Sequence, residues 1–232
     1  MPKFAVYYVP EERDELYRLG SSVVGYDIRK RKTVQTLEEL RHIPGFTDHW
    51  VQKARPHGFH LTIGDSIDFE LGKISEIQNE ISELLGCFNP EHKFALRRRH
   101  DDFVAYWGSA VVLRYDPNDH LKVLHALIAA LIDPIGTGSG YLRRHLDDPE
   151  RESTRPYRIN RTLKFYSPMI FDSYAPHFTL LHPHTGESRE ELTRLFSNTF
   201  ARFDEVVLGS LSLLVQLSEE ENWRIYREFT LT

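Results

Sequence analysis

Hydrophobic and polar residues follow two different periods along this chain. Alternating or aromatic-rich runs predict β-strands at 3–9, 93–98, 103–107, 110–115, 206–217 and 223–231. Apolar residues at helical spacing predict amphipathic helices at 11–24, 72–85, 118–132 and 188–200. The chain therefore mixes strands and helices, which is typical of an α+β protein.

Two further strands, predicted over 59–63 and 176–181, repeat one pattern of histidine, apolar residue, threonine and apolar residue. The pattern occurs as His60-Leu61-Thr62-Ile63 and as His177-Phe178-Thr179-Leu180. Alternate side chains of a strand share a face, so each histidine projects together with its threonine. If the two strands meet across a groove, two imidazoles and two hydroxyls converge on one space.

The order of predicted elements repeats about residue 108. Residues 1–107 and 108–232 each run strand, helix, long insertion, histidine–threonine strand, helix, strand and strand. Such repetition indicates an internal structural duplication. It predicts a single bilobal α+β domain over 1–232, with two antiparallel sheets and flanking helices related by a pseudo-two-fold axis.

The insertion of the second half, residues 136–170, is long and polar. We expect it to form a lid over the groove, because loops of this length are usually functional or disordered. Its glycines, Gly136, Gly138 and Gly140, precede no convincing helix and no Lys-Ser or Lys-Thr pair. The sequence therefore does not predict a phosphate-binding P-loop here.

A phosphodiester is the substrate that suits the paired motifs. Its cleavage by water needs a base for the water's proton and an acid for the departing oxygen, and two imidazoles can divide these roles near neutral pH. The sequence leaves open which of His60 and His177 is the acid. Thr62 and Thr179 can donate hydrogen bonds to the phosphoryl oxygens.

Other residues near the motifs are candidates for substrate binding. Tyr174 precedes the second motif by three residues and can stack on a ring of the substrate. Arg55 can reach an anion, as can Lys53, Arg155 and Arg158. The alternative for the tyrosine is a place in the core, and for the basic residues a solvent-exposed position.

Three other histidines raise the alternative of a zinc site. These are His57, His182 and His184. However, residues three apart in a strand point to opposite faces, and no carboxylate or cysteine stands at a supporting spacing. We therefore expect neither a metal nor a cofactor.

Composition narrows the class of protein. The chain has 232 residues, a net charge of −5 and a single cysteine, Cys87, so an internal disulfide is excluded. It has no apolar run long enough to span a membrane and no signal-peptide pattern at its start. We expect a cytoplasmic monomer. The negative net charge favours a small phosphorylated substrate over long RNA.

At the two motifs the chain resembles the 2H phosphoesterase superfamily, which is named for two His-hydrophobic-Thr/Ser-hydrophobic motifs. The resemblance implies a bilobal α+β fold with a central cleft and metal-free catalysis. It also implies that His60 and His177 are the acid–base pair and that Thr62 and Thr179 are phosphate ligands.

A finer resemblance rests on FAVYYVP near the start, VVGYD at 23–27 and HGFHLTI at 57–63. These segments are similar to a branch of unknown function found with phosphonate-utilisation operons, which implies a cyclic ribose phosphate as the substrate class. Gly64-Asp65-Ser66 departs from the basic, proline-containing continuation of that branch.

The sequence thus predicts metal-independent hydrolysis of a cyclic or 2′-linked phosphodiester of a small nucleotide or sugar phosphate. Two alternatives stay open. One is an RNA end-processing enzyme, either a 2′,3′-cyclic phosphodiesterase or a ligase-type transesterase using the same residues. The other is a catalytically inactive module that binds a ligand in the same cleft.

Overall fold

The computed structural model describes residues 1–148 and 156–231. In this part of the chain, ten strands form one curled antiparallel sheet. They are β1 (Lys3–Tyr8), β4 (Leu61–Asp68), β5 (Ala95–Arg98), β6 (Val104–Trp107), β7 (Ala110–Pro117), β8 (Gly138–Ser139), β9 (His177–Leu181), β10 (Glu205–Val207), β11 (Ser210–Gln216) and β12 (Arg224–Thr230). Two more, β2 (Tyr26–Asp27) and β3 (Lys32–Thr33), form a separate hairpin.

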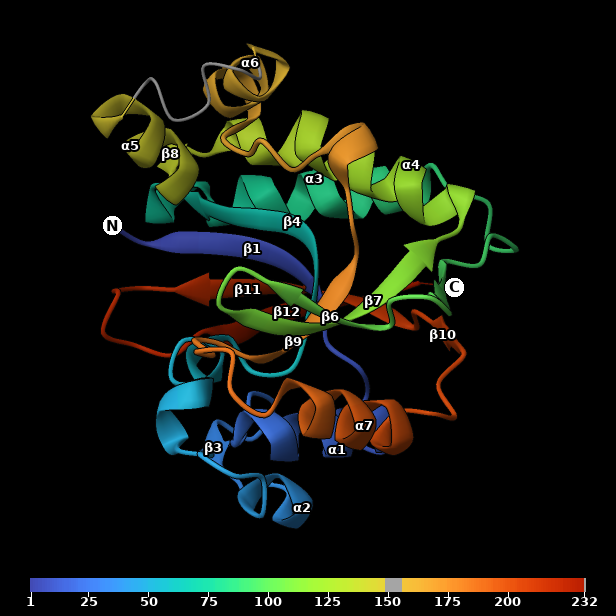
Figure 1. Ribbon diagram of the computed structural model, residues 1–232. Coiled ribbons are helices and arrows are strands. Elements are labelled where there is room, and N and C mark those ends of the chain that lie inside the picture. Colours follow the sequence, from blue (N-terminus) through green and yellow to red (C-terminus); the bar gives the residue numbers. More distant parts are fainter. Residues whose placement is uncertain (149–155, 232) are drawn as a thin grey trace.

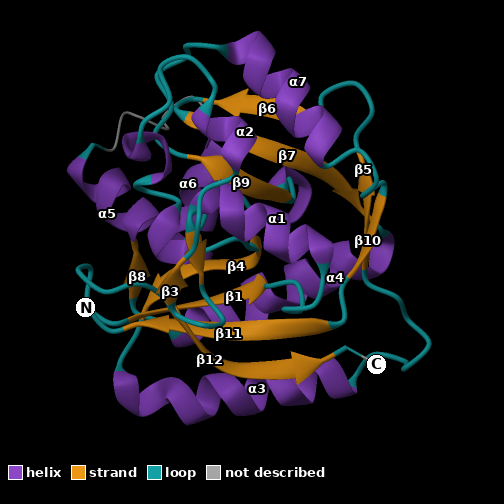
Figure 2. Cartoon of the chain, turned by 90° about the horizontal axis from the view of Figure 1, so that it is seen from below, coloured by secondary structure: helices purple, strands orange, loops and turns teal. Residues whose placement is uncertain are grey.

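The strand order of the main sheet is β10-β5-β7-β9-β4-β1-β11-β12, with β6 beside β7 and β8 beside β4. Figure 2 shows β4, β1, β11 and β12 stacked on one side of the centre and β9, β7 and β6 on the other. The sequence predicts two sheets, whereas the structure joins their strands into one path. The junction is the pairing of β4 with β9 through Leu61 and Phe178.

Helices cover the sheet on two sides (Figure 1). α3 (Ile74–Gly86) and α4 (Asp119–Leu127) lie above the strands in this view, and α1 (Glu15–Val24) and α7 (Arg189–Thr199) lie below. These four helices match the predicted ones. Among the described residues, the other helical segments are α2 (Glu38–Arg41), α5 (Gly140–Asp147), α6 (Pro156–Phe165), the 3₁₀ turns Asp48–Val51, Arg55–His57, Leu71–Lys73, Asp133–Ile135 and Phe171–Ser173, and the π-helical turn Ile128–Ile132.

The apolar residues of both motif strands form the centre of the core. Leu61, Ile63, Phe178 and Leu180 are fully buried, while the threonines between them are partly exposed. Phe59 stacks on Phe178 with ring centroids 4.7 Å apart. The alternation predicted for these strands is therefore present, and packing on one face fixes which side chains reach the other.

Two predicted features differ from the structure. The single strand predicted at 206–217 is divided at Leu208 and Gly209, because β10 pairs with β5 whereas β11 pairs with β1 at the other end of the sheet. The prediction that no helix follows the glycines of 136–140 is wrong, since α5 begins at Gly140. Ser139 supplies the cap: its Oγ accepts a hydrogen bond from the backbone N–H of Leu142 at 3.1 Å.

Candidate active site

The register between the two motif strands brings their polar residues together. Continuing the pairing of β4 with β9 by one residue on either side places His60 opposite Thr179. The same step places Thr62 opposite His177. Directly opposed residues of antiparallel strands have Cβ atoms about 4.5–5.5 Å apart. In agreement with this register, His60 and Thr179 line one cavity together, and Thr62 and His177 line another.

His60 is anchored by the turn that precedes β4. Its Nδ1 lies 2.9 Å from the carbonyl oxygen of Gly58. Gly58 has a φ of 66°, and a side chain there would collide with Ile28. A carbonyl oxygen only accepts hydrogen bonds, so Nδ1 of His60 carries the proton and Nε2 keeps its lone pair.

His177 has the same arrangement. Its Nδ1 lies 2.8 Å from the carbonyl oxygen of Ala175, again two residues earlier in the chain. The ring is therefore held as the Nδ1–H tautomer, with Nε2 available for proton transfer. In both motifs the backbone just before the strand sets the orientation of the catalytic candidate.

The motif residues line two adjoining cavities. One, of about 420 Å³, is bordered by His60, Thr62 and Thr179. The other, of about 370 Å³, is bordered by His177 together with the same two threonines. Thr62 and Thr179 belong to both linings, so the cavities are halves of one cleft, with the hydroxyls at its middle.

Both imidazoles are neutral in the free protein. Burial lowers the pKa of His60 to about 3, and the nearby His57 and His177 act in the same direction. Burial also lowers the pKa of His177, assisted by Arg114 on β7, which pairs with it. Each histidine therefore enters the cleft as a proton acceptor, and the charge of a bound anion would be needed to hold one of them protonated.

An aromatic stack that the sequence did not predict supports His60. The ring of Tyr7 lies flat on the imidazole, with centroids 3.9 Å apart and planes 16° from parallel. His57 stacks at 5.7 Å from His60 and is followed by Trp223 at 5.4 Å from His57. Tyr7 lies in a strand that the sequence predicted, but only the pairing of Tyr7 with Thr62 reveals that it faces the cleft.

Asp65 is a second residue that sequence reasoning missed. Strict alternation from Thr62 would place it on the core side of β4, yet it lines both cavities. One of the two shifts in the register between β1 and β4 explains the difference. Between the pairs Tyr7–Thr62 and Val6–Gly64, β4 contains one extra residue, which reverses the face that Asp65 occupies. Burial raises the pKa of Asp65, whose carboxylate accepts a hydrogen bond from the Ser167 hydroxyl.

Tyr174 and Arg55, which the sequence predicts to bind substrate beside the threonines, lie in different places. Tyr174 borders the cavity of His177, donates a hydrogen bond to the carbonyl of Thr62 at 3.1 Å and stacks on His125 at 3.7 Å. One face of its ring is thus already occupied by a protein side chain. Arg55 borders neither cavity, and its guanidinium binds Asp48 at 3.2 Å.

Other basic residues border the cleft instead. Lys53 lines the cavity of His60, and so do Arg143 and Arg144 of α5. Residues 136–170, which the sequence predicts to form a lid, therefore contribute side chains to the site through α5, a helix within this segment. Of the other two basic candidates, Arg155 lies outside the described residues, and Arg158 does not border either cavity.

The histidines considered as zinc ligands do not form a cluster. His57 and His182 border the cavity of His60, but both ring nitrogens of His184 are engaged elsewhere, by the carbonyl of Glu187 and the backbone N–H of Gly186. Within residues 1–148 and 156–231, no group of three or more histidine, cysteine or acidic side chains is placed to hold a metal ion. Among the same residues, no helix has the length and hydropathy needed to cross a membrane.

Comparison with known proteins finds solved structures of low similarity. No protein-family model matches the chain, and no curated protein matches it. A structure of Kluyveromyces marxianus Usb1 with uridine monophosphate is similar at a TM-score of 0.35 and 12% identity, over 99% of this chain and 97% of that chain. A structure of the same protein described without that nucleotide has a TM-score of 0.33 and 13% identity, over 99% of this chain and 96% of that chain. These values are too low to assign a fold or function, and the comparisons lend no support to the phosphonate-utilisation branch.

Proposed function

We propose that the cleft cleaves a phosphodiester by acid–base catalysis with His60 and His177 and without a metal ion. The observation that carries this proposal is the matched anchoring of the two rings. Each is fixed at Nδ1 by a backbone carbonyl and keeps Nε2 for the substrate. Two such groups on one cleft are what the reaction requires, one to accept a proton and one to donate it.

The reaction then follows from the two protonation states. One neutral imidazole removes the proton from the attacking hydroxyl or water through its Nε2. The other, protonated when the anion binds, donates its Nε2 proton to the departing oxygen. The hydroxyls of Thr62 and Thr179 donate hydrogen bonds to the non-bridging oxygens, where negative charge builds up in the transition state.

The sheet supports the proposal of two related lobes. Read outward from the centre, β4, β1 and β11 on one side correspond to β9, β7 and β5 on the other. β4 and β9 carry the motifs, and β1 and β7 open the two halves of the chain. A duplicated lobe accounts for the same Nδ1 anchor appearing at both motifs.

A panel of substrates tests the reaction class. It contains 2′,3′-cyclic nucleotides, a cyclic ribose phosphate and short RNA, each assayed with EDTA present. Turnover of the small cyclic substrates supports a hydrolase of small phosphodiesters, whereas turnover of RNA alone supports RNA end processing by the same residues. Binding without turnover of any of these compounds would overturn the enzymatic proposal and leave a ligand-binding module.

A further inference from the structure

The two halves of the cleft differ in charge. The half that contains His60 is bordered by four basic side chains, which are Lys3, Lys53, Arg143 and Arg144. In the half that contains His177, the described lining includes no lysine or arginine. The described lysine and arginine side chains therefore line the cleft at one end only. Arg114, which lies over the ring of Trp107 at the other end, is not part of the lining and is paired with Asp102.

Two of the four basic residues are neutralised within the protein. Lys3 binds Glu219 with Nζ and Oε1 2.8 Å apart. Arg143 forms an ion pair with the buried carboxylate of Asp68, which fastens α5 to the edge of β4. These two cations contribute little net charge to the cleft.

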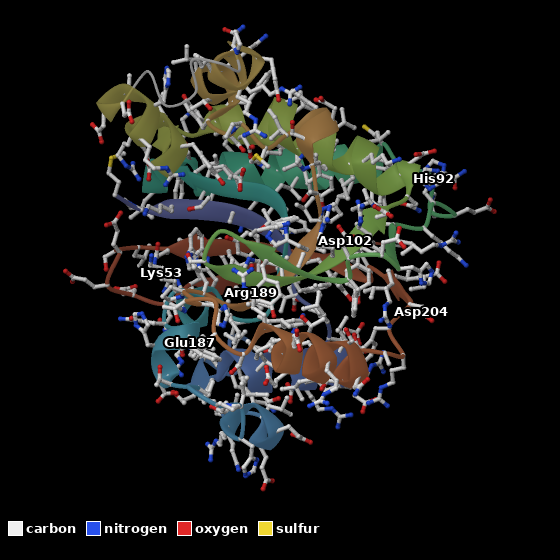
Figure 3. All side chains as sticks on the ribbon, viewed as in Figure 1. Lys53, His92, Asp102, Glu187, Arg189 and Asp204 are labelled. Carbon is white, nitrogen blue, oxygen red and sulfur yellow. The ribbon has the colours of Figure 1, made fainter. Side chains whose placement is uncertain are left out.

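The other two are uncompensated. Among the ion pairs of residues 1–148 and 156–231, none involves Lys53 or Arg144. The guanidinium of Arg144 lies over the ring of Tyr141, 4.6 Å from its centroid. Asp65 lines both halves of the cleft; burial raises the pKa of its carboxyl, and the charge of Arg144 lowers it. Figure 3 shows Lys53 at the surface, between β1 and the lower layer of helices.

Both uncompensated residues are held by ordered backbone. Lys53 donates its N–H to the carbonyl of His182 at 2.8 Å, which ties it to the end of β9. The helix of Arg144 follows β8 directly, and β8 pairs with β4 through Ser139 and Ile67. The positive charges are therefore placed by the same sheet that positions His60 and Thr62.

The opposite half suits an uncharged ring. Its lining includes Trp107, Val112, Met169 and Tyr174. Trp107 meets His177 edge-on, with centroids 4.7 Å apart and planes at 65°. Aromatic and apolar side chains of this kind bind the faces of nucleic-acid bases without needing a particular sequence.

We propose that Lys53 and Arg144 form a subsite for a second phosphate, next to the phosphate that reacts. This inference rests on the proposed function, which places the reacting phosphate between Thr62 and Thr179. A base then occupies the half near Trp107, and the adjoining phosphate of the chain occupies the cationic half. A mononucleotide has one phosphate and leaves the second subsite empty, so the substrate class is a single-stranded RNA oligonucleotide.

The net charge of −5 does not oppose this inference. At physiological ionic strength, charges farther away than about 8 Å are largely screened, so the field in the cleft is that of its own lining. The net charge alone favours a small substrate, whereas the positions of Lys53 and Arg144 in the cleft favour a longer one.

Equilibrium binding tests the subsite separately from catalysis. All proteins in this experiment carry His60→Ala and His177→Ala, so that the ligands are not cleaved. The two ligands are a labelled RNA tetranucleotide and the corresponding mononucleoside 2′,3′-cyclic phosphate. The test adds Lys53→Ala and Arg144→Ala. The matched control adds Arg13→Ala and Lys122→Ala, which also remove one arginine and one lysine but border neither half of the cleft.

We expect the test substitutions to weaken tetranucleotide binding by tenfold or more, with a smaller effect on the mononucleotide. In a plot of the logarithm of the tetranucleotide association constant against the logarithm of the salt concentration, the magnitude of the slope should fall by about 0.7 for each phosphate charge that the variant no longer neutralises. The control should keep the tetranucleotide affinity. Equal weakening of both ligands, or an unchanged tetranucleotide affinity, would overturn the subsite.

Turnover by the protein with both histidines is measured in parallel, with EDTA present. If neither RNA nor cyclic nucleotides are cleaved but the binding result holds, the proposed reaction fails and the subsite stands. If cleavage occurs but the preference for the tetranucleotide does not depend on Lys53 and Arg144, the reaction stands and the subsite fails.

Discussion

His60 and His177 bind their surroundings in the same way although each belongs to a different half of the chain. Each ring directs Nδ1 to the carbonyl oxygen two residues earlier, at 2.9 Å and 2.8 Å. The tautomer and the ring orientation are therefore set before any substrate arrives. Preorganisation of this kind avoids rearrangement during the reaction and is a large part of what active sites contribute.

The ring of Tyr7 should matter for the rate because it holds His60 in place. We expect Tyr7→Leu to lower kcat by about threefold to tenfold, since an aromatic pair is worth about 0.5–1.5 kcal/mol beyond its buried area. Tyr7→Phe keeps the stacked ring and should retain more of the rate. Steady-state kinetics on the best substrate of the panel measure both. A lower rate for Tyr7→Phe than for Tyr7→Leu would contradict the positioning role.

Gly58 links backbone conformation to the site. Its φ of 66° disfavours a side chain, and a Cβ there would lie 2.7 Å from Cβ of Ile28. Gly58→Ala should therefore lower the free energy of unfolding by at least about 1–2 kcal/mol and also reduce kcat, because the displaced carbonyl no longer anchors His60. Urea unfolding and kinetics on the same preparation measure the two effects.

Gly86→Ala is the matched control for that substitution. Gly86 closes α3, and apart from its chain neighbours and its own helix backbone nothing lies within 4 Å of a Cβ added there. We expect this variant to be as stable as the wild type or slightly more stable, and equally active. If the two alanine variants behaved alike, the strained turn at Gly58 would not be what positions His60.

His125 makes stability depend on pH. Its Nδ1 donates to the carbonyl of Ile63 at 2.7 Å, and its Nε2 accepts the N–H of Phe171 at 3.3 Å, so the buried ring is neutral. Burial lowers its pKa from 6.5 to about 4. The fold favours the neutral form of His125. Its contribution to stability is therefore present above pH 6.5 and is lost as the pH falls towards 4.

His125→Gln should therefore reduce the loss of stability in acid. Between pH 7 and pH 5, the decrease in unfolding free energy should be about 2 kcal/mol smaller in the variant than in the wild type. Urea denaturation at the two pH values gives this difference, and any constant effect of the substitution cancels. Equal decreases in the two proteins would show that His125 takes up no proton on unfolding in this range.

Asp133 should have the opposite dependence. It is fully buried, and neither carboxylate oxygen has a hydrogen-bond partner among the described residues. Burial raises its pKa well above 3.8, with Asp65 adding to the rise. The fold favours the protonated form, so the carboxyl costs stability as the pH rises. At pH 8, Asp133→Asn should raise the free energy of unfolding by about 1–3 kcal/mol relative to the wild type, and at pH 4 by much less. Thermal unfolding measures both values. A gain that is the same at both pH values would contradict this.

Alternation along the motif strands was enough to predict which side chains share a face. Leu61 and Phe178 are buried and pair with each other, so the intervening histidines and threonines had to face the same cleft. The four longer helices were equally predictable, because their apolar spacing persists over several turns. These features depend on local periods, which the sequence displays directly.

What the sequence could not show depends on pairing between distant segments. Asp65 faces the cleft because the register between β1 and β4 shifts between Thr62 and Gly64, and no residue pattern marks that shift. Arg144 reaches the site only because β8 joins β4, and the glycines before α5 concealed that helix. Net charge is limited for a related reason, since it averages over the whole surface and does not show that basic residues border one end of the cleft.

Separate replacement of the two histidines is the most direct test of the central claim. His60→Ala and His177→Ala should each lower kcat by about 10²–10⁴-fold, the range for losing a general acid or base. His49→Ala, which removes an exposed histidine outside the cleft, is the control and should keep the wild-type rate. Near wild-type turnover in either cleft variant, with the fold intact by circular dichroism, would contradict the account.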